Sequence, residues 1–140
     1  MLANYGVHVQ GPLFDTMVAH YLIQPELRHN MDYMAETLLN YRTITIDTLI
    51  GQKGRGQKNM RDLSPIDVYR YAAEDADITL RLKNVLEPKL TEYNVQQLFH
   101  EVEMPLIYVL AEMERNGVLL DTESLRETST IFTTRMNEIE

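Results

Sequence analysis

The sequence predicts a predominantly α-helical chain that could contribute at most one edge of a β-sheet. Apolar residues recur at intervals of three and four along most of its length, and helix start and stop signals are frequent. Only the short runs VHV (7–9) and PLF (12–14) are typical of strands. With 140 residues, 44% of them hydrophobic, the chain is long enough for one domain with a core, and it could also be part of a larger protein.

Two helices are expected in the first third of the chain. In FDTMVAHYLI (14–23), Asp15 or Thr16 is a suitable N-cap, and Pro25 should end the helix because proline cannot continue it. MDYMAETLLNY (31–41) repeats apolar residues at helical spacing, which predicts a second helix. Another short helix should follow it.

The strongest helix start lies in LSPIDVYRYAAEDADITLRLKNVLEP (63–88). Ser64 can act as the N-cap, Pro65 suits the first helical position, and Asp67 favours the positive end of the helix dipole. The helix should run to Pro88 or end soon after it.

Two further helices are expected after residue 97. In FHEVEMPLIYVLAEMERNG (99–117), Pro105 should start or kink the helix, and Gly117 offers a left-handed stop. Extended VLL (118–120) then leads to Asp121, a suitable N-cap for a last helix. The apolar stripe of the first helix comprises Phe99, Val102, Leu106, Val109, Leu110 and Met113, and the residues expected to face inward on the second are Leu125, Phe132, Met136 and Ile139. Because the last helix has no stop signal and the start also looks cut, both ends are expected to lie within a larger protein.

The overall composition excludes several classes of protein. The chain has no cysteine, no apolar run of the roughly 20 residues that a membrane span needs, and no signal peptide, so we expect a reducing, soluble compartment. The four histidines show no paired ligand spacing, which argues against a zinc site. A net charge of −8 argues against nonspecific nucleic-acid binding through overall charge.

The segment GQKGRGQKNMR (51–61), here called the cationic loop, departs from this acidic background. It contains no acidic residue, and its three glycines allow the backbone amides to approach phosphates. A solvated flexible loop is an equally good interpretation, because glycine spacing without a preceding strand is weak evidence. The candidate nucleic-acid contacts in this loop are Lys53, Arg55, Lys58 and Arg61.

The stretch YRYAAEDADITL (69–80) contains the candidate active site. Tyr71 and Asp75 are four residues apart on the predicted helix and therefore share a face, whereas Asp77 points elsewhere. A carboxylate can hold a divalent cation, and a neighbouring hydroxyl can orient the water that the cation activates. The alternative is a helix in which Tyr71 packs inside and the acids are solvated.

Five segments in order carry a resemblance: FDTMVAHYLI, RHNMDYMAE, TITIDTLIG, YAAEDADITLRL and EMPLIYVLAEMERNGVLLD. Together they resemble the family A bacterial DNA polymerases (the DNA polymerase I family) over essentially all 140 residues. In that family the first four segments belong to the 3′→5′ proofreading exonuclease, an α/β domain of the ribonuclease H-like fold, and the fifth opens the polymerase domain. The resemblance therefore implies a partial exonuclease domain over 1–92, a linker over 93–96 and the first polymerase helices over 97–140.

The resemblance also implies roles for individual residues. Tyr71 and Asp75 form the third exonuclease motif, in which Asp75 ligates one of two metal ions, Mg²⁺ or else Mn²⁺ or Zn²⁺, and Tyr71 positions the attacking water. Arg28 matches a position that contacts the DNA backbone. Ile46 falls where some relatives have an aromatic residue against the terminal nucleotides.

The remaining catalytic groups are expected to be absent. The D-x-E pair of the first motif is expected to be missing, the carboxylate of the second would fall just before Met1, and those of the polymerase lie far downstream in the family. One aspartate cannot hold two ions, so residues 1–140 alone should bind no metal and be inactive. The larger protein should act on DNA and deoxynucleoside triphosphates in the bacterial cytoplasm, at the nucleoid and not at a membrane, and the isolated chain could self-associate.

Two other functions remain open. A stand-alone exonuclease resembling ribonuclease D would also contain the Tyr71 and Asp75 motif, but it would continue differently after the motif. A non-catalytic acidic helical interaction module would account for the amphipathic helices and the charge, but not for five segments in order. The run EVEMPLIYVLAEMERNGVLLD (101–121) favours the polymerase.

Overall fold

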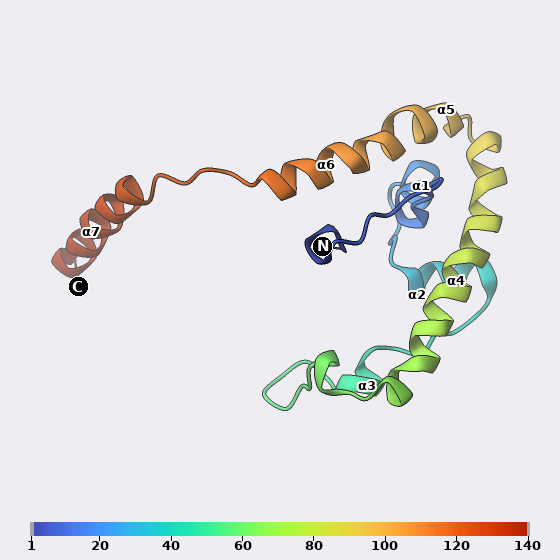
Figure 1. The fold of residues 1–140 in the computed structure, drawn as a ribbon, viewed down its shortest axis with the longest axis horizontal. Helices are drawn as coiled ribbons and strands as arrows, with labels where there is room; N and C mark the ends of the chain where they lie inside the picture. Colours follow the sequence, from blue (N-terminus) through green and yellow to red (C-terminus); the bar gives the residue numbers. More distant parts are fainter. Residues whose placement is uncertain (1, 140) are drawn as a thin grey trace. The chain divides into compact units, whose positions relative to one another are not determined.

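The structure is a computed structural model that describes residues 2–139, and these residues are helical without a strand (Figure 1). They divide into two compact units, one ending at Ile107 and one beginning at Tyr108. In chain order the helices are η1 (Leu2–Tyr5, a 3₁₀ turn), α1 (Thr16–Ile23), α2 (Met31–Leu39), α3 (Asp47–Ile50), η2 (Met60–Asp62, a 3₁₀ turn), α4 (Pro65–Glu92), α5 (Gln96–Leu98), η3 (Phe99–Glu103, a π-helix), α6 (Met104–Asn116) and α7 (Thr122–Ile139). The boundary predicted at 93–96 stays a prediction.

The prediction of strands at 7–9 and 12–14 is wrong for this structure. Both segments are extended or irregular, and Val7 and Val9 are about half exposed. A strand is stabilised by hydrogen bonds to a neighbouring strand. Residues 2–139 offer no such neighbour, so an alternating pattern alone produces no sheet here.

Helices α1 and α2 begin and end largely as the sequence predicts. Asp15 is the N-cap of α1, and its Oδ1 accepts hydrogen bonds from the backbone N–H groups of Met17 (2.8 Å) and Val18 (3.0 Å). Helix α2 ends at Asn40, which adopts the left-handed conformation with φ 51°. Asparagine is one of the few residues that tolerates this conformation well.

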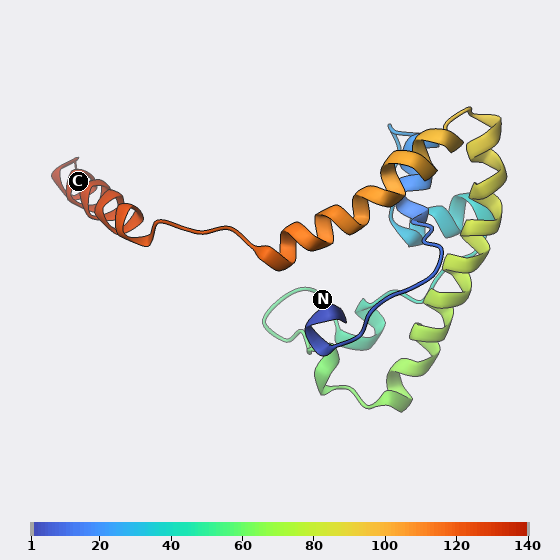
Figure 2. The ribbon, with the colours of Figure 1, turned by 45° about the horizontal axis from the view of Figure 1, so that its top comes forward.

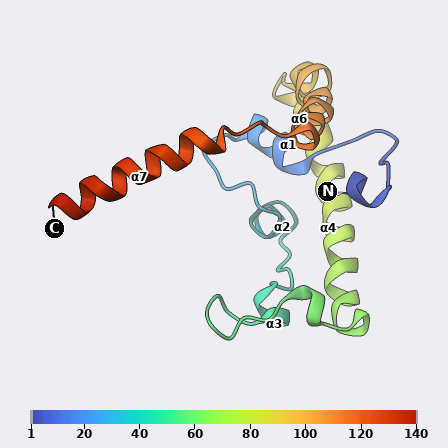
Figure 3. The ribbon, with the colours of Figure 1, turned by 60° about the vertical axis from the view of Figure 1, so that its left-hand side comes forward.

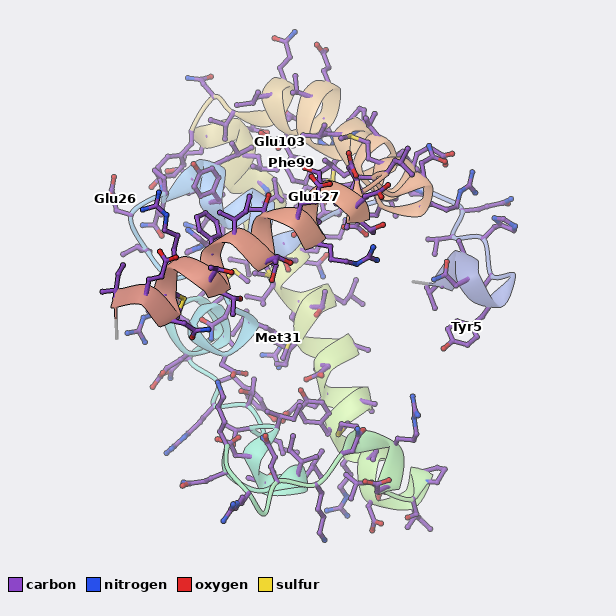
Figure 4. All side chains as sticks on the ribbon, turned by 90° about the vertical axis from the view of Figure 1, so that its left-hand side faces the viewer. Tyr5, Glu26, Met31, Phe99, Glu103 and Glu127 are labelled. Carbon is purple, nitrogen blue, oxygen red and sulfur yellow. The ribbon has the colours of Figure 1, made fainter. Side chains whose placement is uncertain are left out.

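Helix α4 is the element on which the first unit is built, and α1 and α2 both pack on it (Figures 2 and 3). Its buried side chains recur every four residues, which places them in one row facing α1 and α2. The buried core comprises Ala19, Ile23, Met34, Ala35, Ile78, Leu82, Leu86, Leu90, Phe99 and Met104. Figure 4 shows Met31 of α2 near α4, where the Thr79 hydroxyl donates a hydrogen bond to the Met31 sulfur at 3.7 Å.

The ends of α4 confirm the prediction in position but not in every contact. The helix starts at Pro65 and continues past Pro88 to Glu92, as expected. Ser64 occupies the N-cap position, yet its side chain accepts no hydrogen bond from the helix backbone. Instead the Ser64 hydroxyl donates to Asp67 Oδ2 at 2.6 Å, so the expected capping contact is wrong.

The helical backbone is distorted next to Pro105. The five residues of η3 form a π-helix directly before α6, in which Pro105 is the second residue. Proline has no N–H to donate to the carbonyl four residues earlier, and π-type turns occur where this ladder is interrupted. The predicted start or kink at Pro105 is confirmed.

The second unit confirms the predicted start and stop signals but not the predicted burial. Gly117 has φ +67° and its N–H donates to the Met113 carbonyl at 2.9 Å, and Asp121 Oδ1 accepts from Ser124 N at 3.0 Å to cap α7. The expectation that the apolar face of α7 is inward is wrong, since no residue of α7 is buried. Of the stripe on 99–113, Phe99 is buried and the others are exposed, namely Val102, Leu106, Val109, Leu110 and Met113.

No helix within residues 2–139 combines the length and the hydrophobicity needed to cross a membrane.

Candidate active site

Tyr71 and Asp75 extend the buried row of α4 toward its N-terminal end. The row passes through Ile78 and Leu82, and counting back from Ile78 by three and then four residues reaches Asp75 and Tyr71. Residues at this spacing share one helix face. Both side chains are half-buried as a result, and the predicted pairing on one face is confirmed.

The carboxylate of Asp75 is held in an environment that disfavours its charge. Burial raises the pKa of Asp75, the nearby Tyr71 hydroxyl lowers this pKa, and the charges of Asp32 and Glu74 raise it further. Its Oδ1 atom is buried and accepts no hydrogen bond from the described residues. Buried acceptors are normally paired, so an unpaired carboxylate oxygen marks a position suited to a ligand.

The phenol of Tyr71 responds to the same surroundings. Burial raises the pKa of Tyr71, and the neighbouring Asp75 charge raises it further. The hydroxyl therefore keeps its proton at neutral pH and can donate a hydrogen bond to a carboxylate or accept one from a water.

Glu74, the residue before Asp75, makes two contacts that no sequence pattern indicated. Its Oε1 accepts a hydrogen bond from the Tyr41 hydroxyl at 2.6 Å, and its Oε2 accepts one from the backbone N–H of Ile44 at 2.7 Å. Both donors lie about 30 residues away in the chain, so only the folded structure brings them together. Glu74 thereby connects the segment 41–44 to α4.

A second contact holds the same segment to α2. The Thr43 hydroxyl donates to Asp32 Oδ1 at 2.6 Å, and Thr43 is itself buried. Asp32 is one of the charges that raise the pKa values of Tyr71 and Asp75. The segment 41–44 is therefore bonded both to α2, through Asp32, and to α4, through Glu74, and it lies beside the candidate site.

Asp77 is separate from this group, as the sequence predicts. It forms an exposed ion pair with Arg81 (3.7 Å), one helical turn further along α4.

The described residues do not contain a complete metal site. Within residues 2–139 no group of three or more histidine, aspartate or glutamate side chains is arranged to hold an ion. Asp75 could therefore serve as one ligand of a metal ion, but the described residues do not supply the rest of the site. The D-x-E pattern occurs at Asp121, Thr122 and Glu123, outside the residues 1–92 that the resemblance assigns to the exonuclease, so the expected absence of the first motif stays a prediction. Their structure gives the triplet another explanation: it is exposed and starts α7, with Asp121 as the cap.

The residues expected to contact DNA are all exposed. Arg28 lies in the connection between α1 and α2, and Ile46 directly precedes α3 with 42% of its surface exposed. Ile46 is two residues beyond Ile44, so the chain places it within about 7 Å of the residue bonded to Glu74. Their roles in binding stay predictions.

Two hydrogen bonds close the cationic loop at its base, and this distinguishes it from a linker without internal contacts. Lys58 N–H donates to the Ile50 carbonyl at 2.8 Å, and Gln57 Nε2 donates to the Gly51 carbonyl at 3.4 Å. Gly51 has φ +82°, a conformation that glycine adopts readily. Lys53 and Arg55 lie within the closed loop, Lys58 lies at its base and Arg61 lies beyond it in η2, and all four side chains are exposed.

Comparison with known proteins shows what this chain is similar to. A family model described as 3′–5′ exonuclease matches residues 1–91. The DNA polymerase I of Borreliella burgdorferi is 39% identical over 126 residues, covering 90% of this chain and 13% of that protein. The DNA polymerase I of Pseudomonas aeruginosa is 37% identical, covering 88% and 14%, and that of Chloroflexus aurantiacus is 37% identical, covering 99% and 15%. The chain thus spans about one seventh of the length of these relatives.

Proposed function

Because the chain belongs to the 3′–5′ exonuclease family found in DNA polymerase I, we propose that it contributes one metal ligand to the excision of 3′-terminal nucleotides from DNA. The observation that carries this proposal is Asp75 itself. Its buried Oδ1 has no hydrogen-bond donor among the described residues, and it lies beside a protonated phenol on one helix face. Solvated surface acids do not have these surroundings.

The two residues have different roles in the proposed reaction. Asp75 holds a divalent cation through its free oxygen, and Tyr71 orients the water that attacks the terminal phosphodiester bond. Bound Mg²⁺, or Mn²⁺ or Zn²⁺ in its place, would supply Lewis-acid stabilisation and an acidified water. The half-buried position of the pair limits competing solvent and keeps both side chains in fixed orientations.

Residues 1–140 are proposed to work as part of a longer polymerase. Two-metal hydrolysis needs several carboxylates around ions about 4 Å apart, and residues 2–139 contain no group of three or more His, Asp or Glu side chains that could hold an ion. We assign residues 97–140 to the start of the polymerase domain. The longer protein would then use a primer terminus and deoxynucleoside triphosphates during replication and repair at the bacterial nucleoid.

DNA contacts complete the proposal. Arg28 and the cationic loop offer exposed positive charge to the phosphate backbone, and Ile46 offers an exposed apolar side chain to a terminal base. Single strands are bound through this combination of charge and apolar stacking surface.

The test is an Asp75→Ala substitution in a DNA polymerase I polypeptide that contains these residues. We expect 3′→5′ excision of a mismatched primer terminus in Mg²⁺ to be abolished, while primer extension stays near normal, because a metal ligand is lost in a separate domain. Asp77→Ala is the matched control, since Asp77 lies two residues away on the same helix and pairs only with Arg81. Unchanged excision by the Asp75 variant would refute the assignment.

A further inference from the structure

Glu74 lies next to the metal-binding candidate but is engaged in different contacts. Both of its carboxylate oxygens accept hydrogen bonds, one from the Tyr41 hydroxyl (2.6 Å) and one from Ile44 N–H (2.7 Å). These donors fix the orientation of the Glu74 carboxylate, whereas Asp75 Oδ1 has no donor among the described residues. Its position therefore needs an explanation other than catalysis.

The contacts of Glu74 help to hold a segment that has no regular secondary structure. Residues 40–46 form no helix or strand, and Ile44 is exposed. Hydrogen bonds to an ionised group are stronger than those between neutral groups, so two of them restrain a short segment effectively. One contact goes to the backbone, which sets the path of the main chain and not only a side chain.

Two further contacts hold the same segment. The ring of Tyr41 lies 5.6 Å from the guanidinium of Arg81, a cation–π arrangement two helical turns from Glu74. The Thr43 hydroxyl donates to Asp32 at 2.6 Å. The segment is thus attached to α4 at two points and to α2 at one.

The segment leads directly to Ile46, the residue proposed to contact the terminal nucleotides. Ile46 lies two positions after Ile44, whose amide is bonded to Glu74, and Asp75 directly follows Glu74 in α4. Glu74 therefore connects the segment 41–44, which leads to Ile46, to α4, the helix that carries the proposed metal ligand.

We propose that Glu74 is a positioning residue that sets the register of the DNA 3′ end relative to Asp75, with Thr43 and Asp32 as a second, weaker attachment. This inference rests on the proposed exonuclease function. It requires no contact between Glu74 and the DNA or the metal. It accounts for a glutamate beside Asp75 whose two oxygens both accept hydrogen bonds from the segment 41–44.

The test uses Glu74→Ala in a DNA polymerase I polypeptide that contains these residues, with a short single-stranded oligonucleotide as substrate. We expect kcat/KM for excision to fall by about 10- to 100-fold, mainly through a higher KM, because a displacement of about 1 Å is enough for losses of this size. Tyr41→Phe and Thr43→Val each remove one attachment and should give smaller increases in KM. In Tyr41→Phe and Thr43→Val, which retain both Asp75 and the negative charge of Glu74, the Mg²⁺ concentration for half-maximal activity should stay unchanged.

Controls separate this role from stability and from the proposed function. Glu87→Ala removes a glutamate from the same helix that bonds only to Lys83 (2.9 Å), and it should leave KM unchanged. A merely structural role for Glu74 would reduce the active fraction, which lowers kcat with KM unchanged, and that result would overturn the inference. If Asp75→Ala abolishes excision while Glu74→Ala has wild-type KM, the function stands and the inference fails; if Asp75→Ala has no effect, the proposed function itself fails.

Discussion

Replacing Phe99 with alanine should strongly destabilise the first unit. Phe99 is fully buried, and its ring centroid lies 4.8 Å from that of Phe14 in a tilted arrangement. Figure 4 shows Phe99 in η3, which packs against α1. The residue therefore ties η3 to the core formed by α1 and α4.

The expected cost follows from these contacts. Truncation of a buried phenylalanine to alanine costs about 3–5 kcal/mol, and an aromatic pair adds about 0.5–1.5 kcal/mol. Domains of ordinary size are stable by only about 5–15 kcal/mol, so Phe99→Ala should remove a large share of the free energy of unfolding. The midpoint of thermal unfolding should fall by at least about 10 °C.

Circular dichroism at 222 nm during thermal unfolding of residues 1–140 provides the measurement, at a concentration where sedimentation shows one species. Leu98→Ala is the matched control, because this neighbouring side chain is 42% exposed. Phe99→Leu should give a smaller shift and keeps the test usable if the alanine variant does not fold. Equal midpoints for the Phe99 and Leu98 alanine variants would refute the packing described for η3.

Three further outcomes are expected. If the cationic loop contacts DNA phosphates, replacing Lys53 and Arg55 with serine should weaken the salt dependence of single-strand binding. The slope of the logarithm of the binding constant against the logarithm of salt concentration should become shallower by about 0.7 per lost contact. An unchanged slope would mean that the loop is a solvated loop without DNA contacts. Residues 1–140 alone should show neither nuclease nor polymerase activity and no saturable Mg²⁺ binding by calorimetry, whereas metal-dependent degradation that Tyr71→Phe with Asp75→Asn abolishes would contradict this. Because burial raises the pKa of folded Asp75 above the unfolded value of 3.8, its ionisation favours the unfolded state, and wild-type stability falls as pH rises through the folded pKa. Asp75→Asn should therefore be the more stable protein at pH 7 in thermal unfolding, with the difference disappearing below about pH 3.8, and a less stable variant at pH 7 would contradict the sign.

Local signals in the sequence predicted the helices well, because caps and breakers act within a few residues. Asp15, Asp121 and Gly117 each have the predicted role through contacts with neighbours at most four positions away. Ser64 shows the limit of this reasoning, since its hydroxyl has two possible partners and donates to Asp67 instead of accepting from the backbone. Position in the helix was predictable, but the choice of hydrogen bond was not.

Burial was predictable only where the packing partner lies in the described residues. The row of α4 through Ile78 and Leu82 is buried because α1 and α2 cover it. Phe132 of α7 has an equally clear helical pattern, yet it is 63% exposed. A hydrophobic pattern identifies the face that can be buried and does not identify what covers it. The same reason explains why VHV and PLF form no strands.

The site was only partly predictable. The pairing of Tyr71 with Asp75 follows from helical spacing alone, and their half-burial follows from the continuation of the apolar row. The contacts of Glu74 with Tyr41 and Ile44 span 33 and 30 residues, and no periodicity predicts them. Contacts of this kind depend on how the irregular segment 40–46 folds back on α4.

The acidic run from Glu74 to Asp77 contains three carboxylates with three separate environments. Glu74 is bonded to Tyr41 and Ile44, and Asp77 is paired with Arg81, so the charges of both have partners in the protein. Asp75 has a buried oxygen without a donor, and the charges of Asp32 and Glu74 act against its ionisation. Glu74 and Asp77 thus have bonding partners within the protein, whereas no positive group offsets the negative charge around Asp75. The ionised form of Asp75 is therefore unfavourable until a cation binds. The destabilisation expected from ionised Asp75 and its proposed affinity for a metal ion therefore have the same physical origin.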